Sequence, residues 1–192
     1  MAAASRRRVE VSDCGELAVV GFVIGDEHFS AAELDDLAPD RPSVHERLTQ
    51  AVGHLLAGRP ERQRDLLDDA LEAWSVAGAS APRRPSKGSE RPVDRDLVVV
   101  AAERGDVAAM VVRGRPDAVI PRCGAWLHED REVPLSGAVR AAILERCAGE
   151  AARCRLVVAL ADALRIDSQP EDLPELTLLA YVICVAPAAA QS

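Results

Sequence analysis

The chain has 192 residues, of which 48% are hydrophobic and 28% are charged. This composition supplies a sizeable core and excludes general disorder, which requires low hydrophobicity. The formal net charge of −8 argues against overall attraction to nucleic-acid phosphates, and the 3% aromatic content argues against base-stacking surfaces.

A β-hairpin is predicted at the start of the chain. Residues 8–12 alternate between polar and apolar side chains, whereas residues 16–24 form a nearly continuous apolar run. Residues 13–15, Asp-Cys-Gly, supply turn chemistry between them. The second strand should be buried on both faces, because an apolar run without alternation is typical of such strands.

Helices are predicted to follow this hairpin. Two pairs of residues have the spacing of a capping box, in which a serine side chain and a glutamate side chain bond each other's backbone N–H groups. They are Ser30 with Glu33, and Ser43 with Glu46. The first predicts a short helix and the second a helix over about 44–57, followed by another that ends at Gly78.

Residues 79–95 are predicted to form a linker or mobile loop, since they carry Ala, Ser, Pro, Arg, Lys and Gly without periodicity. Together with the N-terminus, this linker holds the local basic clusters. We interpret them as solvated charge and consider nucleic-acid binding unlikely except through these arginines, which are Arg6, Arg7, Arg8, Arg83 and Arg84.

The second half repeats the order of strands and then helices. Strands are predicted at 96–102 and 106–112, with two short ones at 117–121 and 125–128. Residues 136–166 are predicted to be helical, with Ser136 as N-cap and a break at Gly149. Residues 176–186 fit either a helix or a buried strand, of which we favour the helix.

These elements predict an α+β fold with two β-hairpin-plus-helices halves and a mostly antiparallel sheet packed against helices. The expected domains are residues 1–78, which hold the first hairpin and a helical hairpin, and residues 96–192, which hold a β-meander and helices. Residues 79–95 link them, and one continuous domain is the alternative.

The five cysteines are scattered, and the basic N-terminus is not followed directly by an apolar run. This pattern argues against a disulfide framework and a signal peptide. The apolar run from Leu176 to Ala190 is interrupted by Thr177 and Pro187 and is shorter than the ~20 residues of a membrane span. We therefore expect a soluble, cytoplasmic protein with no membrane association.

Cys123, His128 and Arg122 are the candidate catalytic residues. A thiolate activated by an imidazole can act as a nucleophile, and a neighbouring arginine lowers a thiol pKa. Zinc held by Cys123, His128, Cys147 and Cys154 is disfavoured, because seven residues of helical rise separate the last two thiols by ~10 Å. We predict no metal and no cofactor.

Two further sets of residues on helices are interpreted as solvated faces. Arg47 and His54 lie seven positions apart and could bind phosphate and transfer protons, but the pair is common by chance. Adjacent carboxylates such as Asp68 and Asp69 point about 100° apart on a helix and rarely share an ion.

The favoured function is a protein-interaction or small-ligand-binding protein without catalytic activity, which closes its exposed edges or faces by forming a homodimer or by binding a protein partner. The alternative is an enzyme with a dispersed site that uses Cys123 and His128 in thiol-based or metal-dependent chemistry. The sequence contains no phosphate-binding or dinucleotide-binding glycine motif that would decide between them.

Overall fold

The computed structural model describes residues 17–31, 33, 42–59, 64–77, 89–94, 97–104, 107–165 and 175–186. Within these residues the chain forms one nine-stranded sheet. The strands are β1 (Ala18–Ile24), β2 (Glu27–Ser30), β3 (Ser89–Asp94), β4 (Leu97–Arg104), β5 (Val107–Gly114), β6 (Cys123–His128), β7 (Arg131–Pro134), β8 (Leu156–Arg165) and β9 (Leu176–Val185).

The strand order is β2-β1-β9-β8-β5-β4-β3, and the β6–β7 hairpin joins the sheet at the start of β9. All pairs are antiparallel except β6 with β9, which run parallel from Cys123 and Leu176. The predicted α+β class with a mostly antiparallel sheet is therefore confirmed. The sheet is continuous across the two halves, because β1 pairs with β9 from the opposite part of the chain.

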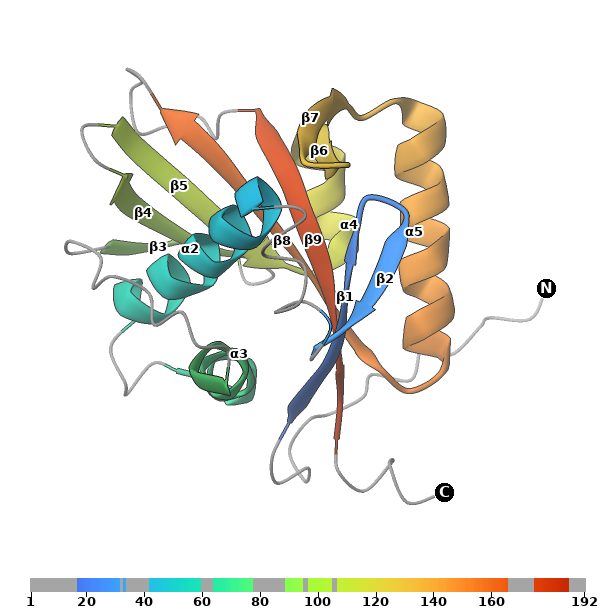
Figure 1. The fold of residues 1–192 in the computed structure, drawn as a ribbon, viewed down its shortest axis with the longest axis horizontal. Helices are drawn as coiled ribbons and strands as arrows, with labels where there is room; N and C mark the ends of the chain where they lie inside the picture. The colour runs from blue at the N-terminus through green and yellow to red at the C-terminus, as the bar shows by residue number, and fades with distance from the viewer. Residues whose placement is uncertain are drawn as a thin grey trace.

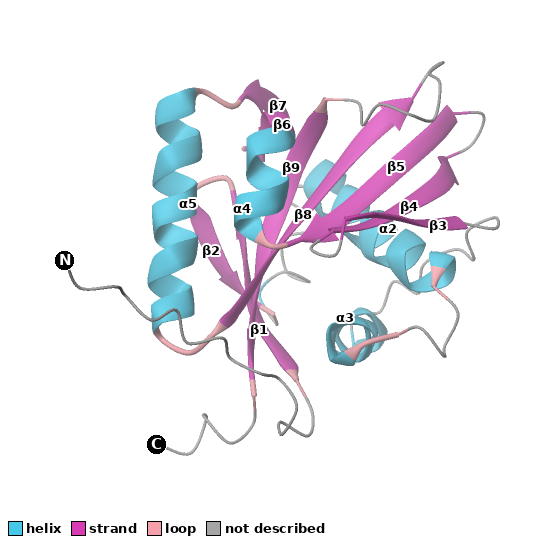
Figure 2. Ribbon diagram, turned by 180° about the vertical axis from the view of Figure 1, so that it is seen from behind, coloured by secondary structure: helices cyan, strands magenta, loops and turns pink. Residues whose placement is uncertain are grey.

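Helices cover both faces of the sheet (Figures 1 and 2). They are α2 (Pro42–Gly58), α3 (Leu66–Ala77), α4 (Pro116–Val119), the 3₁₀ turn η3 (Ile120–Arg122) and α5 (Gly137–Ala152). One apolar core lies between the sheet and α2 and α3, and a second lies between the sheet and the segment from α4 to α5. Alternate residues of β9 enter the two cores, with Leu179 and Val182 in the first and Leu178 and Ile183 in the second.

The predicted first strand at 8–12 lies outside the described residues, and the predicted second strand pairs elsewhere. β1 forms a tight hairpin with β2 through Gly25 and Asp26. Gly25 has φ of +64°, which a glycine adopts at little cost. A Cβ at this position would also lie 2.8 Å from Nδ1 of His128. This turn after Ile24 was not predicted, although Gly25 and Asp26 are residue types that favour turns.

The two long helices of the N-terminal half are confirmed, with bounds of 42–58 and 66–77. The Ser30–Glu33 capping box is confirmed as well: the Ser30 N–H donates to Glu33 Oε2 at 2.8 Å, and the Glu33 N–H donates to Ser30 Oγ at 3.2 Å. At the start of α2, the Val44 N–H donates to Oδ1 of Asp130, which lies in the turn between β6 and β7.

Part of the predicted linker is ordered structure. Residues 89–94 form β3, the edge strand that pairs antiparallel with β4, while residues 79–88 lie outside the described residues. The interpretation as a linker is wrong for residues 89–94, because backbone pairing with β4 orders a segment whose Ser, Pro and charged side chains resemble a loop. An edge position tolerates Pro92, whose nitrogen cannot donate to the ladder.

The predictions for the second half are partly confirmed. Strands β4 and β5 and the short strand at 125–128 are confirmed, but the predicted strand at 117–121 is wrong, because residues 116–122 form α4 and η3. A proline at the first helical position, Pro116, favours this helix. Ser136 is the N-cap of α5, where its hydroxyl accepts from the Val139 N–H.

The two C-terminal segments predicted as helical are strands. The helix α5 ends at Ala152, and residues 156–165 form β8. Residues 176–185 form β9, nine of whose ten residues are buried, so the favoured helix is wrong and the strand alternative is correct. Both segments are buried on both faces, which removes the alternation that would have identified them. Within the described residues no helix is long and apolar enough to cross a membrane.

Candidate functional site

Cys123 lies at the start of β6 in the second core. Its side chain is 1% exposed, and its thiol donates to the Val119 carbonyl at 3.5 Å. Burial raises the pKa of Cys123 to about 12 against the smaller opposing effect of Arg140. A thiol with this pKa is protonated at neutral pH and is not an activated nucleophile.

His128 lies at the other end of the same strand. Five residues of extended strand separate it from Cys123 by roughly 16 Å, and its Nδ1 lies 3.4 Å from Oδ1 of Asp26. Its ring stacks on Trp126 with centroids 5.3 Å apart. The exposed Arg122 donates to the Ala118 carbonyl. The structure therefore does not bring the three predicted catalytic residues together.

The disfavoured zinc ligands are also dispersed. Cys147 is buried in the second core, whereas Cys154 is exposed after the end of α5. Among the residues that the structure describes, no three His, Cys, Asp or Glu side chains are grouped closely enough to hold a metal ion.

The structure instead has an apolar groove of about 620 Å³ between the start of α3 and the adjoining ends of β4, β5 and β8. Eight of its lining residues are Leu or Val, namely Leu17, Leu66, Leu67, Leu97, Val98, Leu156, Val157 and Val158. Three arginines and two aspartates complete its charged lining: Arg64, Arg113, Arg115, Asp65 and Asp69. We call this hollow the α3 groove.

A buried ionic cluster anchors α3 to the sheet beside the α3 groove. The side chain of Arg113 on β5 is 3% exposed and donates to Asp65 Oδ2 at 2.8 Å. Arg113 also lies 3.0 Å from Oδ1 of Asp68, whose side chain is fully buried. Arg59 donates to the other oxygen of Asp68. Two arginines thus compensate the buried carboxylate, as a buried charge requires.

The same carboxylates begin helix α3. Oδ1 of Asp65 accepts from the N–H groups of Leu67 and Asp68, and Oδ2 of Asp68 accepts from the Asp65 N–H at 2.9 Å. This is a capping box with aspartate at both positions. Burial raises the pKa of Asp65, but the hydrogen bond and charge of Arg113 outweigh it, so the net pKa lies below its usual value. Burial is also the largest effect on Asp68, and its pKa is raised.

Two interpretations of charged helix residues are corrected here. Asp68 is fully buried, although Asp69 is exposed, so the pair is not a solvated face. Arg47 is not solvent-facing either, because its side chain is 13% exposed and binds Asp162 on β8 through two bonds, of 2.7 and 2.5 Å. The capping spacing of Asp65 and Asp68 was a usable sequence signal, whereas the partners Arg113 and Asp162 lie too far along the chain to be inferred.

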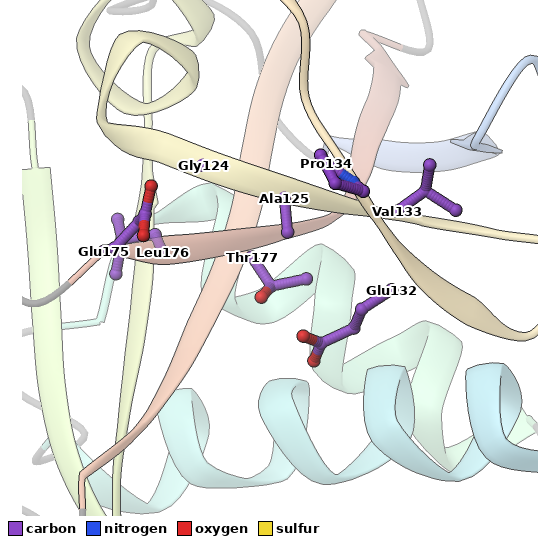
Figure 3. A pocket seen from close by; sticks show the side chains of 8 residues that line it. All are labelled: Gly124, Ala125, Glu132, Val133, Pro134, Glu175, Leu176 and Thr177. Carbon is purple, nitrogen blue, oxygen red and sulfur yellow. The ribbon is translucent and has the colours of Figure 1, made fainter.

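A second hollow of about 520 Å³ lies where β6 and β7 meet the start of β9 (Figure 3). Its lining comprises Gly124, Ala125, Glu132, Val133, Pro134, Glu175, Leu176 and Thr177. We call it the β9 pocket. Glu132 also accepts from Arg47, which connects the rim of the β9 pocket to α2.

Comparison with known proteins adds no assignment to this geometry. The sequence matches no protein-family model and no curated protein.

Proposed function

We propose that the protein is a non-catalytic binding protein that holds a small amphipathic ligand in the α3 groove. The observation that carries the proposal is the groove's lining of eight Leu and Val side chains beside three arginines. Its volume of about 620 Å³ falls within the range of small-ligand sites, ~300–1,000 Å³. A largely apolar pocket with a few polar groups and ionisable residues of shifted pKa is the expected form of such a site.

The charged groups favour a ligand with an anionic end. Of the three lining arginines, Arg113 is held by Asp65 and Asp68, and Arg64 donates to Glu72. Arg115 is 61% exposed and pairs with the equally exposed Asp117. An exposed pair of this kind contributes little stability and can exchange its anion. We therefore place the anionic end of the ligand toward Arg115 and its apolar body against Leu156 and Val158.

The test is displacement of a fluorescent apolar probe by ligands that differ only in their end group. Alkanoates, alkylammonium ions and alkanols of equal chain length are titrated against the protein and its bound probe. The proposal expects all three to compete through their chains and the alkanoate to compete best. Equal competition by alkanoate and alkylammonium ion would contradict the anionic end, and no probe binding at all would contradict the groove.

A pair of matched variants locates the binding. Leu156 and Val20 are both 37% exposed, so an aspartate at either position is tolerated similarly by the fold. Only Leu156 lines the α3 groove. We expect Leu156→Asp to abolish probe binding and Val20→Asp to leave it unchanged. Equal effects of the two variants would show that the probe binds elsewhere.

The alternative of an enzyme using Cys123 and His128 receives no support from their separation, and we do not propose it. The homodimer and the cytoplasmic location stay predictions. Native mass spectrometry of protein purified from its own host tests the first together with ligand binding, since it reports the number of chains and any retained molecule. A retained mass that Leu156→Asp removes would support the binding proposal.

A further inference from the structure

The α3 groove holds two hydrogen-bond donors that the residues described by the structure leave unpaired. They are the Nε–H groups of Arg113 on β5 and of Arg64, which lies just before α3. Both arginines line the groove, and both Nε atoms are buried. Because buried N–H groups are normally paired, two unpaired ones in a single groove point to an acceptor that a ligand brings.

The other nitrogens of these two side chains are engaged. Nη1 and Nη2 of Arg113 donate to the two oxygens of Asp65, and its Nη2 also lies 3.0 Å from Oδ1 of Asp68. Nη1 of Arg64 donates to Glu72 at 2.8 Å, and its Nη2 donates to a backbone carbonyl of α2 at 3.2 Å. These contacts fix each guanidinium group, so its Nε–H cannot turn away to find another partner.

The two unpaired donors favour a neutral acceptor over a second anion. Each guanidinium already has an anionic partner, since Arg113 pairs with Asp65 and Asp68, and Arg64 pairs with Glu72. An anion at either Nε would lie beside these carboxylates and be repelled by them. A carbonyl oxygen accepts the same hydrogen bond without adding a charge.

Arg113 lies among the apolar residues of the groove and apart from Arg115. It is opposite Val98 of β4 and Leu160 of β8 in the sheet, and opposite residues of antiparallel strands point to the same face. Val98 lines the groove as well. Arg115 follows two residues later, which separates the two Cα atoms by about 7 Å of extended chain. An acceptor that reaches Arg113 therefore belongs to the body of the ligand and not to its charged end.

We propose that the ligand of the α3 groove is an oxo-alkanoate, a carboxylate with a carbonyl group inside its alkyl chain. The carboxylate faces Arg115, and the chain carbonyl accepts from an unpaired Nε–H group of Arg113 or Arg64. Both Nε atoms are covered in the structure, so binding moves the covering side chains apart. This inference rests on the proposed function and names the class of its ligand.

Displacement of the apolar probe by positional isomers of one oxo-alkanoate tests this inference. The isomers share chain length, charge and polarity and differ only in the position of the carbonyl. We expect one isomer to bind about fivefold more tightly than the others, because only its carbonyl meets the buried donor. A dicarboxylate of the same length should bind more weakly than this isomer. Equal affinity of all isomers, or tighter binding of the dicarboxylate, would overturn the proposal.

Substitution of the arginines by lysine identifies the donor. In lysine a methylene group takes the place of Nε, while the positive charge is kept. We expect Arg64→Lys or Arg113→Lys to remove the preference for the best isomer. Arg140→Lys is the matched control. Its Nε is also buried and unpaired among the described residues, but Arg140 donates to the carbonyls of Cys123 and Leu135 and does not line the groove.

The proposed function and this inference can fail separately. If no alkanoate displaces the probe, the proposed function fails and the inference falls with it. If the unsubstituted alkanoate displaces the probe but all isomers bind equally, only the inference is refuted. A preference that survives in both lysine variants, or that Arg140→Lys also removes, would refute the role of the Nε–H groups. If Arg113→Lys does not fold, the isomer series on the unchanged protein still decides the outcome.

Discussion

Replacing Arg113 by methionine tests the ionic cluster that joins α3 to the sheet. The Arg113 side chain is 3% exposed, and its partner Asp68 is fully buried. In Arg113→Met, Asp68 keeps Arg59 as its one cationic partner among the residues that the structure describes. Breaking a buried pair by removing one member costs about 3–5 kcal/mol. Because Arg59 remains, we expect a loss of unfolding free energy near the lower end, about 3 kcal/mol.

Urea denaturation followed by circular dichroism measures this loss. With a denaturant slope of about 2 kcal/mol/M, the unfolding midpoint should fall by about 1.5 M. The double variant Arg113→Met/Asp68→Leu should recover only part of the loss: replacing both charges by apolar groups is often neutral or stabilising, but Asp68 also accepts from the Asp65 N–H and pairs with Arg59. The reasoning would be refuted if Arg113→Met changed the midpoint as little as a surface substitution, or if the double variant were the less stable.

Arg115→Met is the matched control for this experiment. Arg115 lies two positions further along the same segment and pairs with Asp117, but both side chains are more than 60% exposed. Exposed pairs contribute about 0–1 kcal/mol. The contrast between the two arginines therefore isolates burial as the cause of the loss.

Three further predictions concern the thiols and one turn. Under native conditions the exposed Cys154 should react with iodoacetamide, whereas Cys123 should stay unmodified, because burial raises its pKa to about 12. Peptide mapping after a short pulse of iodoacetamide distinguishes the two thiols. Rapid labelling of Cys123 would contradict its assignment as a buried thiol. The same burial predicts a loss of stability at alkaline pH. The folded pKa of each buried thiol lies above its unfolded value, so its contribution is complete below about pH 8.5 and is lost as the pH rises toward 12, by about 1.4 kcal/mol per pH unit and thiol. Urea midpoints between pH 8 and pH 10 would reveal it, and a midpoint that stays constant over this range would contradict the buried thiols. Finally, Gly25→Ala should lower the unfolding free energy by about 1–2 kcal/mol, because Gly25 has a positive φ and its Cβ would meet His128; a fully stable variant would exclude that turn geometry.

The elements that were predicted correctly carry local signals. Helix α2 has an apolar stripe, and the strands β4 and β5 are short β-branched runs around a turn. Helix α5 has the Ser136 cap at its start. Such signals depend on neighbours within a few residues, so they can be read from the sequence without knowledge of the tertiary structure.

The strands β8 and β9 were mistaken for helices for a physical reason. Residues 157, 159, 161 and 163 of β8 enter one core, and Val158 and Leu160 enter the other. With both faces apolar and alanine at three positions, the segment resembles a buried helix, and pairing on both edges overrides that propensity. The C-terminal end of α5 was also not predicted. The residue that takes the left-handed conformation after it, with φ of 60°, is Cys154 and not the glycine that usually marks a helix end.

The two hollows could not be predicted because their walls come from distant parts of the chain. The α3 groove joins residues from 17 to 158, and the β9 pocket joins the β6–β7 hairpin to residues 175–177. No local pattern marks Thr177 or Arg113 as a site residue. Only the sheet order brings these residues together, and that order follows from long-range pairing.

The central position of β9 affects how the protein can fold during its synthesis. β9 pairs with β1, β6 and β8, and its register with β1 joins Phe22 to Val182. Since synthesis proceeds from the N-terminus, the ladder edges of β1 and β6 that β9 will occupy emerge long before β9 does, and that of β8 emerges about ten residues before it. Exposed ladder edges are templates for wrong pairing with another chain. The nascent protein should therefore need shielding by a chaperone until β9 has been made, and its yield should depend on that shielding more than its final stability suggests.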